Sequence, residues 1–296
     1  MMMHPPKTSA ALWHVILTGI ILLAFTGVAR SQTSGRSPID EEIAKQEKIY
    51  NSRGLDVPQG YVTGRGLSSY VQLLPGFCGS LGALGSSDRW LDIGAGAAQA
   101  ILDYYAPEAQ SAGKMCSGAG GRVRAVAISI EDRRTEKWRR RAASLDDGRI
   151  QYLAGRRLRQ YAPDELGKFQ IITDVFGGFS YTDDLSGFVE RALRLLDTGG
   201  VFYTLMQSVH LENGSDNPKT SYLTEMVDAA GRDQKVCSWL KHISCVEVTC
   251  ESKSNWQAPT ELINIRKVCG DVSVPHISLL KYEAGDPPGR RFQIEP

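Results

Sequence analysis

The hydrophobic residues of this chain gather into short apolar runs, which are separated by longer segments of helical character. The clearest of them, residues 123–130, is rich in Val, Ile and Ala and alternates little between apolar and polar residues. Such runs are typical of strands that are buried on both faces of a parallel sheet. We predict five of these strands, in residues 90–93, 123–130, 150–153, 169–175 and 201–206.

Helical segments lie between these strands. Residues 97–105 favour helix, residues 132–145 form a strongly charged helix, and in residues 183–196 the apolar side chains recur at helical spacing. Strands that alternate with helices along a chain are typical of a doubly wound sheet. The sequence therefore predicts an α/β fold with a mostly parallel sheet.

The last third of the chain has a less regular pattern. Three further strand candidates lie in residues 243–250, 262–268 and 276–282. Residues 220–231 and 233–242 are predicted to form a broken helix. Residues 207–219 are polar and suit a substrate loop, and residues 285–296, which are rich in Pro and Gly, are predicted to be a tail.

The N-terminal segment is apolar over residues 10–29, follows Lys7 and ends at Ala29-Arg30-Ser31. This pattern predicts a secretory signal over residues 1–31, with cleavage after Ser31. An uncleaved membrane anchor stays open, because about 20 apolar residues can just span a bilayer, and so does a buried helix. The predicted protein is therefore exported, or anchored to a membrane through residues 10–29.

After this segment, the chain has the length of one α/β domain with additions. We predict a linker and N-terminal extension over residues 32–66, with a short exposed helix in residues 39–50 and a loop in residues 54–66. The main domain covers residues 67–284 and begins with a helix at 67–74, and the tail covers residues 285–296.

The stretch from Trp90 to Tyr105 contains the clearest candidate site. The apolar run Trp90-Leu91-Asp92-Ile93 stops at Gly94-Ala95-Gly96, and a helix follows. The glycines permit positive φ and carry no Cβ, so a ligand can lie against backbone N–H groups at the start of that helix. A nucleotide-like ligand fits this geometry.

This stretch and a later turn both resemble motifs of a known enzyme family. Asp92-Ile-Gly94-Ala-Gly96-Ala-Ala98 resembles the first motif of class I S-adenosylmethionine-dependent methyltransferases, and Leu196-Asp-Thr-Gly-Gly200 resembles the turn that precedes their fifth strand. The resemblance implies a seven-stranded, mostly parallel sheet with one antiparallel strand, and S-adenosylmethionine as the cofactor. The similarity covers residues 67–206 in detail and continues more loosely to residue 282.

The resemblance also implies roles for single residues. The cofactor would be bound by Asp92, Gly94, Ala95, Gly96, Glu131 and Asp174. Glu131 is assigned to the ribose although the family's acidic position falls at Ser129, and Arg156 stands where the family commonly has an acidic residue. Tyr61 and Tyr70 are candidates to line the cofactor pocket, with aromatic packing as the alternative.

Catalysis is assigned to Asp174 and Tyr181, at the carboxyl end of the fourth predicted strand. In a doubly wound sheet, ligands bind beyond these strand ends. A methyl transfer needs an in-line approach of the acceptor, and Asp174 would help if that acceptor must lose a proton. The alternative for Asp174 is a cap on the next turn.

Composition and residue spacing add three constraints. The net charge of +1 indicates no strongly charged partner. The 6 cysteines are even in number, which suits disulfides in an oxidising compartment, with buried free thiols as the alternative. No metal site is expected, since the chain has no Cys-x-x-Cys pair and its His and Cys residues are not spaced as zinc ligands.

The sequence thus predicts a methyltransferase that acts on an unidentified acceptor. The sequence motifs of nucleic acid methyltransferases, Asn/Asp-Pro-Pro-Tyr and Pro-Cys, are absent, which favours a small molecule, a lipid or a protein. The alternative is an exported, non-catalytic methyltransferase-like binding domain, because the cofactor is made in the cytosol. A nicotinamide-dependent oxidoreductase is disfavoured, since no Tyr-x-x-x-Lys pair accompanies the glycines.

Overall fold

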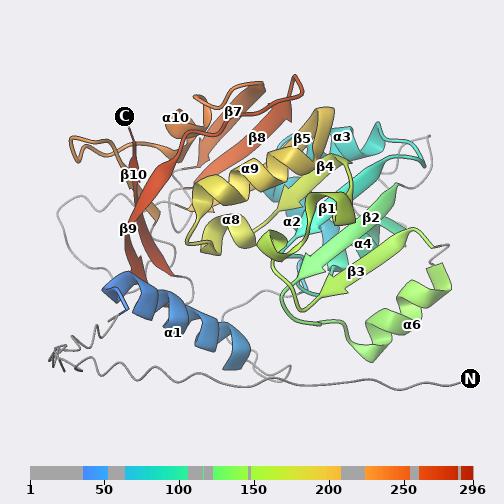
Figure 1. Ribbon diagram of the computed structural model, residues 1–296. Helices are drawn as coiled ribbons and strands as arrows, with labels where there is room; N and C mark the ends of the chain where they lie inside the picture. The colour runs from blue at the N-terminus through green and yellow to red at the C-terminus, as the bar shows by residue number, and fades with distance from the viewer. Residues whose placement is uncertain are drawn as a thin grey trace, which may run out of the picture. The chain divides into compact units, whose positions relative to one another are not determined.

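The computed structural model describes residues 36–52, 64–105, 116, 123–145, 148–207, 224–253, 260–285 and 288–295. Within these residues seven strands form one sheet, in the order β3-β2-β1-β4-β5-β8-β7 (Figure 1). The strands are β1 (Arg89–Ile93), β2 (Arg124–Ser129), β3 (Ile150–Ala154), β4 (Phe169–Asp174), β5 (Leu196–Gln207), β7 (Val246–Lys253) and β8 (Thr260–Lys267). All run parallel except β8, which is antiparallel to both of its neighbours. The predicted α/β, doubly wound, mostly parallel seven-stranded sheet with one antiparallel strand is confirmed.

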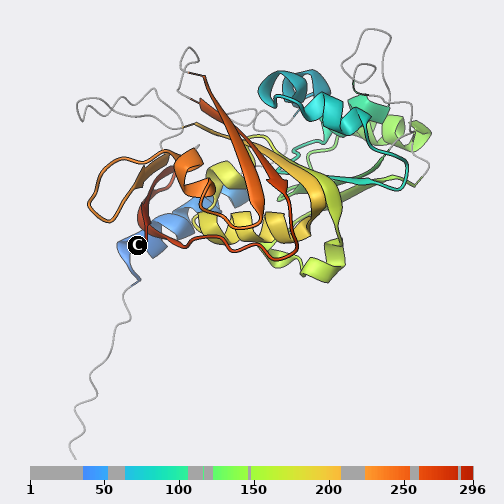
Figure 2. The same cartoon turned by 90° about the horizontal axis from the view of Figure 1, so that it is seen from above.

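Helices cover both faces of this sheet. One face carries α2 (Leu67–Leu73), α3 (Phe77–Gly82), α4 (Gln99–Tyr105) and α6 (Glu136–Leu145), and the other carries η1 (Leu158–Gln160), α7 (Pro163–Leu166), α8 (Gly178–Tyr181), α9 (Leu185–Leu195) and α10 (Val236–Leu240). Figure 2 shows α2 and α3 on the side of the sheet opposite to α9. Successive side chains of β1 point to opposite faces of the sheet. Trp90 packs in the apolar cluster on the face that carries α2, and Leu91 packs in the cluster on the face that carries α9.

A second, three-stranded sheet has the order β6-β10-β9, and it corrects two predictions. β6 (Thr224–Val227) is a strand inside the segment 220–231 that we predicted as helix. β10 (Gly289–Ile294) lies in the predicted tail and pairs with β6 and with β9 (Ile277–Glu283). Phe292 of β10 is buried in the core. Both errors have the same cause, since β6 and β10 pair with each other although they lie far apart in the chain.

The N-terminal helix α1 (Pro38–Ser52) packs against this second sheet. The backbone amide of Ala284 donates to Glu42 Oε2 over 2.9 Å, and that of Gly285 donates to Gln46 Oε1 over 2.8 Å. The predicted short helix over residues 39–50 is present, and its predicted exposure fails at Gln46. Gln46 is buried because α1 covers the end of β9.

Two other helices are shorter than predicted. α6 begins at Glu136 rather than near residue 132, because the amide of Arg134 donates to Asp132 Oδ1 over 3.1 Å in a turn before the helix. α10 covers Val236–Leu240 of the predicted 233–242 segment. Residues 208–219 of the predicted loop and Tyr61 lie outside the described residues, as does the signal segment 1–31, while Gln207 ends β5.

All of the cysteines are paired in disulfides, which join Cys78 to Cys116, Cys237 to Cys250, and Cys245 to Cys269. The alternative of buried free thiols was therefore wrong, and the pairing suggests an extracytoplasmic protein. Among the helices of the described residues, none has both the length and the apolar character that crossing a bilayer requires.

Candidate functional site

A cavity of about 480 Å³ opens at the carboxyl ends of β1, β2 and β4. Its wall at these three strand ends consists of Ile93, Gly94, Gly96, Ser129, Ile130, Glu131, Gly177 and Gly178. The order of the sheet reverses next to β1, with β2 on one side and β4 on the other. Ligands of doubly wound folds bind at such a switch point, and the volume is within the range of small-molecule sites.

The glycine turn after β1 is a tight and well-anchored structure. Gly94 has φ +69° and Gly96 has φ +55°, both in the left-handed region that favours glycine. The amide of Ala95 donates to the carbonyl of Ile128 on β2 over 3.0 Å, and the Tyr152 hydroxyl donates to the carbonyl of Gly96. The backbone of the turn therefore lies at a fixed place in the cavity wall, while the Ala95 amide is already used inside the protein.

The loop after β4 packs directly on this turn. A Cβ atom on Gly94 would lie 2.5 Å from the Cα of Gly177, which is far closer than two non-bonded carbon atoms can approach. Gly177 is itself confined, since a Cβ there would lie 2.6 Å from the carbonyl oxygen of Ile93. Glycine at both positions is what allows the two loops to form one continuous wall.

Asp92 faces away from the cavity. Its side chain is completely buried on the α2 side of the sheet, where the Tyr70 hydroxyl donates to both carboxylate oxygens, over 2.9 and 2.8 Å, and Thr173 Oγ1 donates over 2.8 Å. Burial raises the pKa of Asp92 to about 7. Tyr70 packs against Phe77 and Trp90, so it belongs to the aromatic core rather than to the cavity wall.

Asp174 also lies behind the cavity wall. Its buried carboxylate accepts hydrogen bonds from the backbone amides of Gly177, over 2.9 Å, and Phe179, over 3.1 Å. Burial raises the pKa of Asp174 to about 7, and the charge of Asp92 acts in the same direction. These contacts are those of a cap on the turn 174–179, and they hold Gly177 against Gly94.

The two buried carboxyls predict a dependence of stability on pH. Their pKa of about 7 in the folded state exceeds the ordinary value of an aspartate, so the folded protein binds more protons than the unfolded chain between about pH 4 and about pH 7. We expect the free energy of unfolding to decrease as the pH rises from about 5 to about 7, by on the order of 1 kcal/mol per pH unit for each carboxyl. Urea unfolding over this range measures the slope.

Asp92→Asn provides the control for this prediction, because the amide keeps the shape of the carboxyl and does not titrate. The variant should show a smaller slope than the natural protein. A free energy of unfolding that stays constant or increases over the same range would contradict the assignment.

Glu131 lies in the cavity wall just beyond the end of β2. Its carboxylate forms an ion pair with Arg133, and 26% of its side chain is exposed. The neighbouring Ile130 is 40% exposed, which is unusual for a large apolar residue, and it lines the same cavity. Ser129 is buried in the wall beside them. The end of β2 thus presents one carboxylate and one uncovered apolar side chain.

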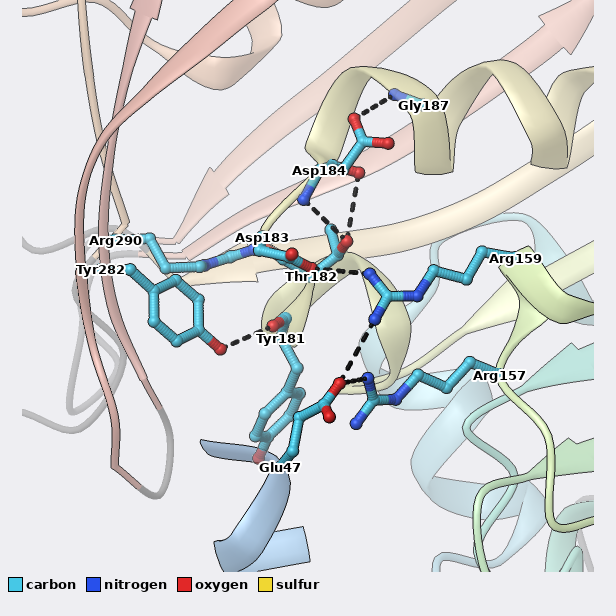
Figure 3. A network of polar contacts seen from close by, with 10 residues as sticks. All are labelled: Glu47, Arg157, Arg159, Tyr181, Thr182, Asp183, Asp184, Gly187, Tyr282 and Arg290. Carbon is cyan, nitrogen blue, oxygen red and sulfur yellow. Dashed lines mark hydrogen bonds and ion pairs between the residues drawn. The ribbon is translucent and has the colours of Figure 1, made fainter. Parts of the chain in front are cut away.

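Tyr181 and Arg156 complete the residues that we predicted from the sequence. Tyr181 of α8 lines the cavity, and its backbone carbonyl accepts a hydrogen bond from the Tyr282 hydroxyl over 3.3 Å (Figure 3). Arg156 forms an ion pair with Glu165 and lies 3.9 Å from the centre of the Tyr161 ring. Of the residues considered from the sequence, the cavity is lined by Gly94, Gly96, Ser129, Glu131, Arg156 and Tyr181, whereas the predicted Asp92, Ala95 and Asp174 do not line it.

Sequence reasoning missed one side of the cavity. Gln46 and Glu47 of α1 line it, together with Arg157 and Arg159 at the start of η1. The run Arg156-Arg157-Leu158-Arg159 was a visible signal, since three arginines directly after a strand end are available to a ligand there. The place of α1 had no local signal, because its position depends on the second sheet.

Comparisons with known proteins give a fold and no family assignment. No family model matches the chain, and no curated protein matches it. Phosphoethanolamine N-methyltransferase 2 of Haemonchus contortus, in complex with S-adenosyl-L-methionine, is similar in structure with a TM-score of 0.47 and 12% identity over 78% of this chain and 57% of that chain.

Two further methyltransferase structures are similar. Geranyl diphosphate methyltransferase, in complex with GPP and sinefungin, has a TM-score of 0.36 and 16% identity over 50% of this chain and 48% of that chain. An rRNA methylase of Streptococcus thermophilus has a TM-score of 0.41 and 11% identity over 65% of this chain and 94% of that chain. This chain spans about half the length of the first two proteins. These likenesses concern the fold alone.

Proposed function

We propose that this protein binds S-adenosylmethionine in the cavity beside the glycine turn and transfers the methyl group to an acceptor. The single observation that carries the proposal is the shared wall, in which the backbone of Gly94 and Gly96 and the carboxylate of Glu131 face one cavity at the switch point of the sheet. S-adenosylmethionine has an amino acid end, which would contact the glycine backbone, and a nucleoside end, which would contact the Glu131 carboxylate.

The residues present fit this cofactor. The backbone at Gly94 and Gly96 would hold its methionine end, where no side chain intervenes. The Glu131 carboxylate can accept hydrogen bonds from both ribose hydroxyls, and the exposed Ile130 side chain would gain burial under the adenine ring. When bound, the cofactor supplies an activated methyl group on a sulfonium.

The buried aspartates have positioning roles in this proposal. Asp92 anchors β1 to Tyr70 and Thr173, and Asp174 holds the loop that contains Gly177. Neither carboxylate lines the cavity, so we assign contact with the acceptor to Tyr181. Catalysis in this proposal depends on the alignment of the acceptor with the methyl group rather than on a carboxylate base.

A second candidate is a non-catalytic binding domain of an exported protein. It is favoured by the ion pair of Glu131 with Arg133, since a ribose would have to compete for that carboxylate. It is also favoured by the disulfides, which suggest a compartment away from the cytosolic cofactor supply. In both candidates we propose export, with residues 1–31 as the signal or the anchor.

Calorimetry on the purified full chain tests the proposal. We expect S-adenosylmethionine and its demethylated product to bind with micromolar affinity, and Glu131→Gln to weaken both by about tenfold through loss of a charge-assisted hydrogen bond. Glu225→Gln is the matched control, because that carboxylate pairs with Arg291 and neither residue lines the cavity. Absence of binding heat would contradict the proposal, and binding without methyl transfer to any acceptor would favour the second candidate.

A further inference from the structure

Arg157 and Arg159 converge on a single carboxylate oxygen in the cavity wall. Arg157 Nη1 lies 2.7 Å from Glu47 Oε1, and Arg159 Nη2 lies 3.5 Å from the same oxygen (Figure 3). Glu47 belongs to α1, whereas both arginines follow β3. The N-terminal helix thus places an anionic group at the point where two guanidinium groups meet.

The Glu47 carboxylate is an exchangeable occupant of this point. Its side chain is 45% exposed, so water competes for it, and exposed ion pairs contribute little to stability. Arg159 has a second attachment, since its Nη1 donates to Asp183 Oδ1 over 3.1 Å. Arg159 would therefore keep the Asp183 contact if the Glu47 carboxylate left.

Gln46 supplies an independent sign of a ligand. Its side chain is only 2% exposed, and its Oε1 accepts the hydrogen bond from Gly285. Its Nε2, although buried, has no hydrogen-bond partner within the described residues. A buried donor without an acceptor is costly, and Gln46 lines the same cavity as the arginine pair. An acceptor oxygen from a ligand would satisfy it.

We propose that Arg157, Arg159 and Gln46 form a subsite for an oxyanion on the methyl acceptor, and that Glu47 occupies this subsite until the acceptor binds. The inference rests on the proposed function, because the same cavity is assigned to the cofactor. Guanidinium groups and an amide N–H₂ group are donors that suit phosphate and carboxylate oxygens. The acceptor class is therefore a compound with a phosphate or carboxylate group.

The charge of the cavity agrees with this class. Its wall contains 7 arginines and 5 carboxylates, so positive charge is in excess even with Glu47 in place. Departure of the Glu47 carboxylate increases that excess at the arginine pair. An anionic acceptor restores the balance.

Calorimetric titration of the full chain with inorganic phosphate, and separately with acetate at equal ionic strength, tests the subsite. We expect Glu47→Gln to bind one of the two anions about tenfold more tightly than the natural protein, because the apparent affinity follows the fraction of sites that is free. Glu42→Gln is the matched control on the same helix, since its carboxylate accepts from Ala284 and Lys45 instead of the arginines. Replacement of both Arg157 and Arg159 by Gln should abolish anion binding.

Each outcome has one meaning. Tighter binding of phosphate in Glu47→Gln assigns a phosphorylated acceptor, and tighter binding of acetate assigns a carboxylate. Equal anion affinity in Glu47→Gln and the natural protein overturns the subsite. S-adenosylmethionine binding is measured on the same variants, so a protein that binds anions but not the cofactor contradicts the proposed function and leaves the subsite standing.

Discussion

Replacement of Gly94 by arginine is expected to lower the affinity for S-adenosylmethionine below detection. Gly94 has φ +69°, and a Cβ there would lie 2.5, 3.5 and 3.6 Å from the Cα, C and N atoms of Gly177. Because all three are backbone atoms, relief requires the loop after β4 to move out of the cavity wall. The arginine side chain would then occupy the space that the proposed cofactor needs. Calorimetry measures the loss.

Gly199→Arg is the matched control for this variant. Gly199 has φ +86°, so it has a similar left-handed backbone, but nothing lies within 4 Å of its added Cβ. The substitution therefore costs about 1–2 kcal/mol of backbone strain and causes no clash. We expect cofactor affinity to be unchanged in Gly199→Arg. Unchanged affinity in a folded Gly94→Arg, as verified by near-UV circular dichroism, would mean that the cofactor binds elsewhere.

Reduction of the disulfides is expected to give the largest loss of stability. The three bridges span 38, 13 and 24 residues of sequence. A disulfide that closes a loop of this length lowers the conformational entropy of the unfolded chain. Each bridge thereby stabilises the folded protein by about 3–4 kcal/mol. Such a sum approaches the total stability of an ordinary domain. Thermal unfolding with and without a reducing agent should therefore differ widely.

A single bridge can be isolated in the Cys245→Ser, Cys269→Ser double variant. This bridge joins the turn before β7 to the chain that follows β8. We expect its free energy of unfolding to be about 3 kcal/mol lower in urea, with a smaller further loss on reduction than in the natural protein. Thiol titration is the accompanying measurement. Free thiols in the unreduced, denatured natural protein would contradict the pairing.

The strands of the parallel sheet could be predicted from local sequence because their signal is local. An unbroken apolar run such as Ala125–Ile128 has no polar face, so it fits only where both faces are buried. The short strands β6 and β10 lack such a run. β10 includes Arg290, which is buried because it donates to the carbonyls of Phe179 and Thr182 and to the hydroxyl of Thr224. Partners so distant in sequence cannot be inferred from the residue itself.

The sequence predicted which backbone segment lines the candidate site, but it did not predict which side chains point into the site. The positions of Gly94 and Gly96 follow from the turn that a strand-to-helix connection requires, and both line the cavity. Asp92 is next to that turn in sequence, but side chains alternate along a strand, so its carboxylate emerges on the α2 side. Asp174 is in register with Ile93 and points to the other face, and it misses the cavity because its carboxylate is used by the amides of Gly177 and Phe179.

The sequence by itself determined the alternation of strands and helices, the glycine bend after the first strand, and hence the edge of the sheet at which the cavity opens. These properties depend on short-range steric and hydrophobic preferences, which each segment carries alone. The tertiary structure decided which side chains reach the cavity, which cysteines pair, and that α1 brings Gln46 and Glu47 to Arg157 and Arg159. The contact of Glu47 with Arg157 joins residues 110 apart, and the disulfides join residues 13 to 38 apart. These contacts come from the packing of whole elements, so no local pattern specifies them.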